Sequence, residues 1–136
     1  MPVTNAFKIA ELIRHMSYNS SDDVIVMTKG TTDLNKKKGD ATYTATTEVA
    51  LDTFAHASFR AARYIVAMSE GSNFHSTEIM IVHDGSAVTL TQYGTLKDTT
   101  LATFDADISG DNVRLLVTPA STNSTVVKFQ GTLIDA

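Results

Sequence analysis

Hydrophobic and polar positions alternate with a period of two over most of the chain, and Gly, Asn or Asp clusters separate the alternating stretches. This period is typical of β-strands that bury one face. The clearest examples are residues 59–68, 74–83, 87–93, 101–108, 113–118 and 125–134. Asp84-Gly85 predicts a two-residue hairpin turn, because glycine accepts the positive φ that such a turn needs. The pattern therefore predicts a mainly β protein, an antiparallel β-sandwich or barrel of about seven or eight strands.

Residues 6–18 depart from this alternation. Ile9, Leu12, Ile13 and Met16 fall at the i, i+3, i+4 and i+7 positions of one helical face, and Phe7 lies near its edge. This spacing predicts one short N-terminal α-helix. Because so short a helix is marginal alone, its apolar face must dock on its own sheet or on a neighbouring subunit, and both alternatives stay open.

Residues 24–27 predict a first strand, and residues 30–40 are polar and contain the run Lys36-Lys37-Lys38. We interpret the lysine run as part of a solvated loop, with a partner contact as the alternative. The chain is therefore divided into an N-terminal arm, residues 1–40, with the amphipathic helix, the first strand and the lysine-bearing loop, and a β-sandwich domain, residues 41–136.

Composition narrows the classes of function. The 136 residues suit one domain, and the absence of cysteine excludes disulfides and thiolate chemistry. A net charge of −4 without a clustered basic surface argues against nucleic-acid binding. No apolar run approaches the roughly 20 residues that cross a bilayer, so no membrane partner is expected.

Candidate catalytic and metal-binding residues do not form recognisable sets. His75 and His83 lie about 26 Å apart if their strand is extended, so they cannot share an ion. Asp105 and Asp107 face one side of a strand, where paired carboxylates can act in acid–base chemistry or bind calcium, but a solvated strand face is the favoured interpretation. No Gly-x-Ser-x-Gly or Gly-rich phosphate loop is present. We therefore predict no catalytic, cofactor-binding or metal-binding residues, and expect the protein not to be an enzyme.

Several segments between residues 59 and 120 resemble a β-rich structural domain of tailed bacteriophage virion proteins, particularly marine and cyanobacterial ones. These segments are Phe59-Arg60-Ala61-Ala62-Arg63-Tyr64-Ile65-Val66, Val82-His83-Asp84-Gly85, Thr91-Gln92-Tyr93-Gly94-Thr95, Phe104-Asp105-Ala106-Asp107-Ile108 and Gly110-Asp111-Asn112-Val113-Arg114-Leu115-Leu116-Val117-Thr118-Pro119-Ala120. The domain occurs in tail-fibre-like and other virion proteins. The resemblance covers about half of the chain, and its motifs are structural patterns rather than catalytic signatures.

The resemblance implies a non-enzymatic virion structural protein that is assembled in the host cytoplasm as a homo-oligomer in contact with other capsid or tail proteins. A small accessory component fits best, such as a capsid decoration protein or a neck, tail or baseplate appendage. The alternative is a receptor-binding module that recognises a host surface glycan or protein. The expected assembly contacts are Phe7, Ile9, Leu12, Ile13, Met16, Lys36, Lys37 and Lys38.

Overall fold

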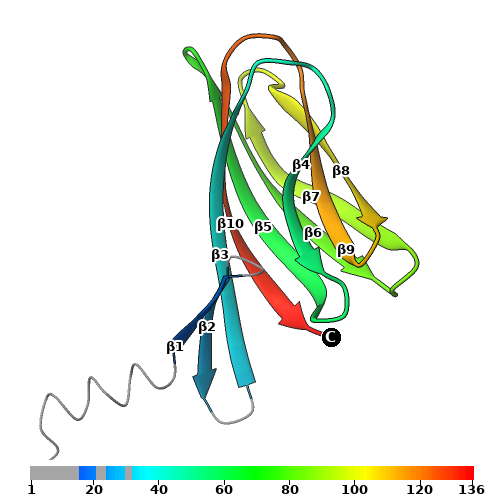
Figure 1. Cartoon of the computed structure of the whole chain (residues 1–136). Helices are drawn as coiled ribbons and strands as arrows, with labels where there is room; N and C mark the ends of the chain where they lie inside the picture. Colours follow the sequence, from blue (N-terminus) through cyan, green and yellow to red (C-terminus); the bar gives the residue numbers. More distant parts are fainter. Residues whose placement is uncertain (1–15, 21–23, 30–31) are drawn as a thin grey trace, which may run out of the picture.

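The computed structural model describes residues 16–20, 24–29 and 32–136, which form two antiparallel β-sheets. In this part of the chain, seven strands form the larger sheet in the order β1-β2-β3-β10-β5-β6-β7, and three form the smaller in the order β4-β9-β8. Figure 1 shows the smaller sheet beside the larger one, with β1 and β2 next to the lower part of β3. The strands are β1 (Met16–Asn19), β2 (Val24–Lys29), β3 (Thr32–Tyr43), β4 (Val49–Ala55), β5 (Phe59–Glu70), β6 (Asn73–His83), β7 (Val88–Lys97), β8 (Ala102–Ser109), β9 (Asn112–Pro119) and β10 (Thr125–Asp135).

The alternating pattern of the sequence is confirmed as a mainly β, antiparallel fold, although the described residues form more strands than the seven or eight expected. On β5, inward residues alternate with outward ones, because successive side chains of a strand point to opposite faces. Each large apolar side chain buried in this way contributes about 1.5–3 kcal/mol. The inward residues of β5 are Ala62, Tyr64, Val66 and Met68, and the outward ones are Arg63, Ile65 and Ala67.

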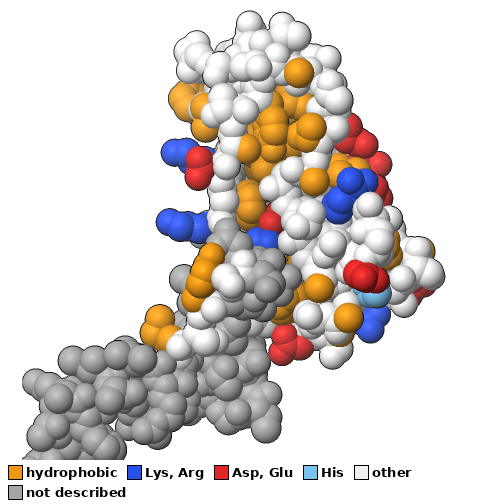
Figure 2. All heavy atoms as spheres, in the orientation of Figure 1, with side chains coloured by type: hydrophobic (Ala, Val, Ile, Leu, Met, Phe, Trp, Pro, Cys, Tyr) orange, Lys and Arg blue, Asp and Glu red, His pale blue; other side chains and the backbone are white. Residues whose placement is uncertain are grey.

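The hydrophobic core lies between the two sheets. Phe54 of β4 contacts the ring of Phe59 of β5 edge to face, with ring centroids 6.3 Å apart. Val113, Leu115 and Val117 supply the inward face of β9. Figure 2 shows hydrophobic side chains gathered between β3 and β4, where the core reaches the edge of the two layers. In the described part of the chain, no helix is long and apolar enough to cross a membrane.

The predicted lysine-bearing loop is wrong: Lys36, Lys37 and Lys38 lie in β3, which pairs with β10 over its whole central part. Between residues 35 and 39 the inward positions of this strand are Asn35, Lys37 and Gly39, none of which is apolar, so the usual alternation is absent from the part of β3 that the sequence predicts as a loop. Residues 40 and 41, the expected boundary between arm and domain, are neighbours within β3. The division of the chain into these two parts stays a prediction.

A buried ionic cluster replaces hydrophobic contacts at Lys37. The Lys37 ammonium lies 2.7 Å from Asp52 Oδ1, and it donates a hydrogen bond to the carbonyl of Thr53 at 2.8 Å. The Tyr64 hydroxyl donates to Asp52 Oδ2 at 2.7 Å. Because Lys37 and Tyr64 belong to the larger sheet and Asp52 to the smaller, the cluster links the two sheets. Burial raises the pKa of Asp52, while the Lys37 cation opposes this shift.

Two glycines give aromatic rings room against the larger sheet. Gly131 of β10 lies between Lys37 and Tyr64, and a Cβ there would be 3.0 Å from the Tyr64 ring. A Cβ on Gly39 would lie 2.6 Å from the ring of Phe129, its partner on β10. The Tyr64 and Phe129 rings meet edge to face with centroids 5.7 Å apart. The absent side chains therefore leave room for both rings close to the β3 and β10 backbones.

The N-terminal helix predicted for residues 6–18 falls mostly on residues 1–15, which lie outside the described part of the chain. Its last residues, Met16 and Tyr18, lie in β1, where they pair with Met27 and Ile25 of β2. This end of the prediction is wrong, because pairing with β2 outweighs the weak helical preference of a short segment.

The turn after β6 is longer than the predicted two residues. β6 ends at His83 and β7 begins at Val88, and the amide of Asp84 donates to the carbonyl of Ala87 at 3.1 Å. The Asp84 carboxylate accepts from the amides of Ser86 and Ala87, and these bonds lower its pKa to about 2. Gly85 does adopt positive φ, at 98°. The side chain of Asp84 therefore closes a four-residue loop as an Asx-turn does.

Candidate functional site

Exposed large hydrophobic side chains gather on the seven-stranded sheet. Nine are found in the described residues, and all of them belong to strands of this sheet: Met16, Tyr18, Ile65, Phe74, Met80, Val82, Tyr93, Leu96 and Ile134. The three-stranded sheet carries none among its described residues. Contiguous exposed apolar surface on a folded protein is typical of an interaction site.

The outward side of β3, β10, β5, β6 and β7 is named here the open face. Its residues follow the strand register, so that Lys38, Gln130, Ile65, Glu78 and Tyr93 form one row across the five strands. The open face consists of Lys36, Lys38, Asp40, Lys128, Gln130, Thr132, Ile134, Arg63, Ile65, Ala67, Phe74, Ser76, Glu78, Met80, Val82, Thr89, Thr91, Tyr93 and Leu96. Apolar and charged side chains are mixed on it, as in many protein interfaces.

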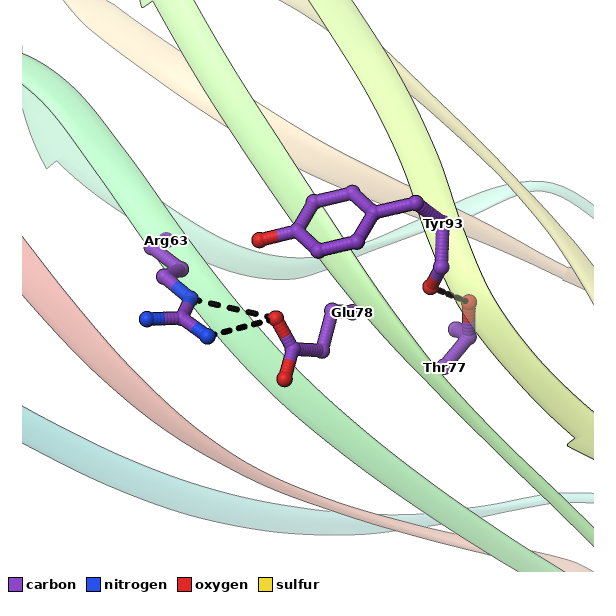
Figure 3. A network of polar contacts seen from close by, with 4 residues as sticks. All are labelled: Arg63, Thr77, Glu78 and Tyr93. Carbon is purple, nitrogen blue, oxygen red and sulfur yellow. Dashed lines mark hydrogen bonds and ion pairs between the residues drawn. The ribbon is translucent and has the colours of Figure 1, made fainter.

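A polar network stands at the centre of the open face (Figure 3). Arg63 donates from Nε and Nη2 to Glu78 Oε2, at 3.2 and 2.6 Å. The Tyr93 ring extends over Glu78 from the neighbouring strand, with its hydroxyl toward Arg63. Hydrogen bonds from Arg63 and then Tyr93 lower the pKa of Glu78. The network fixes three long side chains in one arrangement, which reduces the entropy that a partner would have to remove on binding.

Two grooves run along β10 on the open face and share Lys38, Ile65 and Gln130. The first has a volume of about 530 Å³ and is also lined by Tyr18 and Thr132. The second has a volume of about 930 Å³ and continues toward Lys128. Both grooves are open to solvent, and their walls combine cations, amides and hydroxyls with the apolar side chain of Ile65.

The predicted assembly contacts fall into three groups. Phe7, Ile9, Leu12 and Ile13 lie outside the described residues, and their role stays a prediction. Met16 is 43% exposed on β1. Lys36 and Lys38 are exposed on the open face, where Lys36 donates to the Thr132 hydroxyl at 2.7 Å. Lys37 points the other way and is 7% exposed against Asp52, so only its two neighbours can meet a partner.

The apolar part of the open face was not predicted from the sequence. The sequence feature that could have revealed it is the uninterrupted apolar run Ile79-Met80-Ile81-Val82 in β6, in which inward and outward positions are both apolar. Such a run is typical of a strand covered on both sides. Here Ile79 and Ile81 face the core, while Met80 and Val82 are about half exposed.

The histidines that suggested a metal site have structural contacts instead. His83 accepts from the amide of Gly85 through Nδ1 at 3.1 Å and lies 2.7 Å from the carbonyl of Phe59 through Nε2. These two contacts place its proton on Nε2. His75 accepts from the amide of Leu101 at 3.3 Å. In the described part of the chain, no three His, Cys, Asp or Glu residues lie close enough to hold a metal ion.

Comparison with solved structures shows what this fold is similar to. The tailspike protein of Acinetobacter phage vB_ApiP_P1 matches 74% of this chain with a TM-score of 0.51 and 19% sequence identity. The fold is shared with part of a phage tailspike. The tailspike of Acinetobacter baumannii phage AM24 matches 76% of the chain with a TM-score of 0.48 and 9% identity. The tailspike gp49 of Acinetobacter baumannii bacteriophage Fri1 matches 91% with a TM-score of 0.46 and 13% identity.

The chain spans less than a third of each tailspike, namely 22%, 26% and 21% of their lengths. No protein-family model and no curated protein matches it. The expectation that the protein is not an enzyme is corrected by the third comparison, because the Fri1 protein is described as a capsular polysaccharide depolymerase and is therefore an enzyme. The assignment to marine and cyanobacterial phages in particular stays a prediction.

Proposed function

We propose that this chain is a component of a bacteriophage tail and that the open face is the surface through which it contacts other virion proteins. The observation that supports the proposal most directly is that seven of the nine exposed large hydrophobic side chains in the described residues lie on the open face, and that none lies on the three-stranded sheet. Burying these side chains against a partner would remove apolar surface from water, which is the main driving force of stable association.

The fold favours the tail among the virion locations considered. Its similarity to a segment of the vB_ApiP_P1 tailspike supports a tail protein over a capsid decoration protein. The sequence resemblance supports a virion protein and fits both locations, so the choice of the tail over capsid decoration rests on the fold.

A second candidate function is recognition of a host surface glycan. The observation that favours it is the pair of adjoining grooves on the open face, with Lys36, Lys38 and Lys128 as cations and Gln130 and Thr132 as hydrogen-bonding groups. Purified protein would then bind host cells, and extracted surface polysaccharide would compete for that binding. A tail component without this role would ignore both.

Separation of phage particles into heads and tails tests the main proposal. We expect peptides of this chain in the tail fraction, at a copy number set by the tail's rotational symmetry. A matched sample of heads should contain none. Hundreds of copies in the head fraction would contradict the proposal and indicate capsid decoration.

A further inference from the structure

The two outer surfaces of the protein carry opposite charge. The open face holds four basic side chains, Lys36, Lys38, Arg63 and Lys128, against two acidic ones, Asp40 and Glu78. In Figure 2, Lys and Arg side chains project to the left of β3, away from the core. The open face is therefore net positive, although the whole chain has a net charge of −4.

The outward side of the three-stranded sheet is net negative and is named here the acidic face. Phe104, Ala106 and Ile108 of β8 pack toward the core, so Asp105 and Asp107 point outward, as the favoured interpretation of the sequence predicted. The acidic face carries Asp105, Asp107 and the adjoining Glu48 against the single cation Arg114.

The pairing of these charges leaves acid in excess. Arg114 donates from Nε to Asp107 Oδ1 at 2.7 Å, and this contact lowers the pKa of Asp107. Asp105 accepts only a local bond from the amide of Ala106, and both Asp105 and Glu48 are exposed. Asp105 therefore has no cation of its own, and Glu48 shares the charge of Arg114 with Asp107.

Most of the uncharged side chains on the acidic face are short. Its other outward residues are Ala50, Thr53, Thr103 and Thr118, and Leu116 is only 6% exposed. Short side chains of this kind let a partner's protruding groups approach the strands closely. Ile65, Met80 and Val82 of the open face, each about half exposed, are protruding groups of that kind.

We infer that copies of this chain associate head to tail, with the open face of one copy against the acidic face of the next. The inference rests on the proposed function in that it identifies one partner of the open face as a second copy. Two open faces would bring Lys36, Lys38 and Lys128 against their own counterparts, and like charges in contact cost several kcal/mol. Opposite faces instead bring cations to Asp105 and Glu48. A contact between two different faces produces a ring when its rotation closes.

Charge reversal on each face tests the inference. The first variant, Lys38→Glu/Lys128→Glu, reverses the open face, and the second, Glu48→Lys/Asp105→Lys, reverses the acidic face. In the described part of the chain, none of the four side chains lies within ion-pair distance of an opposite charge, so both variants should keep the native circular dichroism spectrum. Asp111→Lys is the control, because this fully exposed side chain lies in the turn between β8 and β9.

Sedimentation velocity measures association of the chain. Wild type and the Asp111→Lys control should associate, and added salt should weaken the association, as expected for surface charges. Each double variant alone should associate at least about tenfold more weakly. An equimolar mixture of the two should recover association, because every contact then joins opposite charges again.

Three results would overturn the inference. A wild type that stays monomeric shows no contact between copies. Undiminished association of the acidic-face variant shows that the open face meets another surface. A mixture that stays dissociated shows that the two faces do not meet each other. Failure of the proposed function would give a different result. The chain would then be missing from the tail fraction of the phage, while the two charge-reversal variants could still associate when they are mixed.

Discussion

Replacement of Asp52 by alanine is expected to lower the free energy of unfolding by about 3–5 kcal/mol, the usual cost of breaking a buried ion pair. The change leaves the Lys37 ammonium, 5% exposed in its side chain, without its counter-charge. It also leaves the Tyr64 hydroxyl without its acceptor. Because the cluster joins the two sheets, the loss should appear as a shift of the whole cooperative unfolding transition. Urea denaturation followed by circular dichroism measures it.

The matched control removes all three polar ends at once, as Lys37→Met/Asp52→Leu/Tyr64→Phe. Replacing a buried ionic cluster by apolar residues of similar volume is often neutral or stabilising, because the cost of desolvating the charges disappears. The triple variant should therefore be more stable than Asp52→Ala. A loss below about 1 kcal/mol for Asp52→Ala would show that the cluster is accessible to water or rearranges.

The second large effect is expected at Gly39. Alanine in place of a strand glycine normally stabilises by about 0.4–1 kcal/mol through the unfolded chain. At Gly39 the added Cβ would stand 2.6 Å from Phe129, whose ring is held against Tyr64. We expect Gly39→Ala to destabilise instead, by about 1–3 kcal/mol, as overpacking does.

A double-mutant cycle shows whether the ring is the cause. In a Phe129→Ala background the ring atoms nearest to the added Cβ are gone, so Gly39→Ala should there be neutral or stabilising. The change of sign between the two backgrounds is the informative quantity. Equal changes in the free energy of unfolding in both backgrounds would show that the Phe129 ring is not the cause of the destabilisation.

The sequence predicts the strands whose inward side is apolar and does not predict the one whose inward side is polar. Residues 59–68, 101–108 and 113–118 carry a clear alternation, and all but Leu101 lie in strands. The sequence predicts a loop for residues 30–40 because Lys37 and Gly39 occupy inward positions where valine or leucine would be expected. Each is explained by a residue far along the chain, Asp52 for Lys37 and Phe129 for Gly39. Local pattern cannot reveal such partners.

The candidate site, too, is only partly predicted by the sequence. The sequence shows the run of three lysines, but it does not show that Lys36 and Lys38 are exposed while Lys37 is buried. That difference depends on the side of the strand to which each side chain points. Ile65, Met80 and Val82 were visible as apolar residues and were indistinguishable from core residues without knowledge of which strand face is covered. The pairing of opposite charges on the two outer faces required the strand order of both sheets.

Methionine oxidation tests most directly the claim that the open face is an interaction surface. Met80 is 48% exposed at the centre of this face, while Met68 is 3% exposed in the core of the same chain and serves as an internal reference. Limited peroxide treatment followed by mass spectrometry would compare intact phage particles with purified chain diluted until it is monomeric. We expect Met80 to oxidise readily in the diluted chain and as slowly as Met68 in the particle. Equally rapid oxidation of Met80 in both samples would contradict the claim.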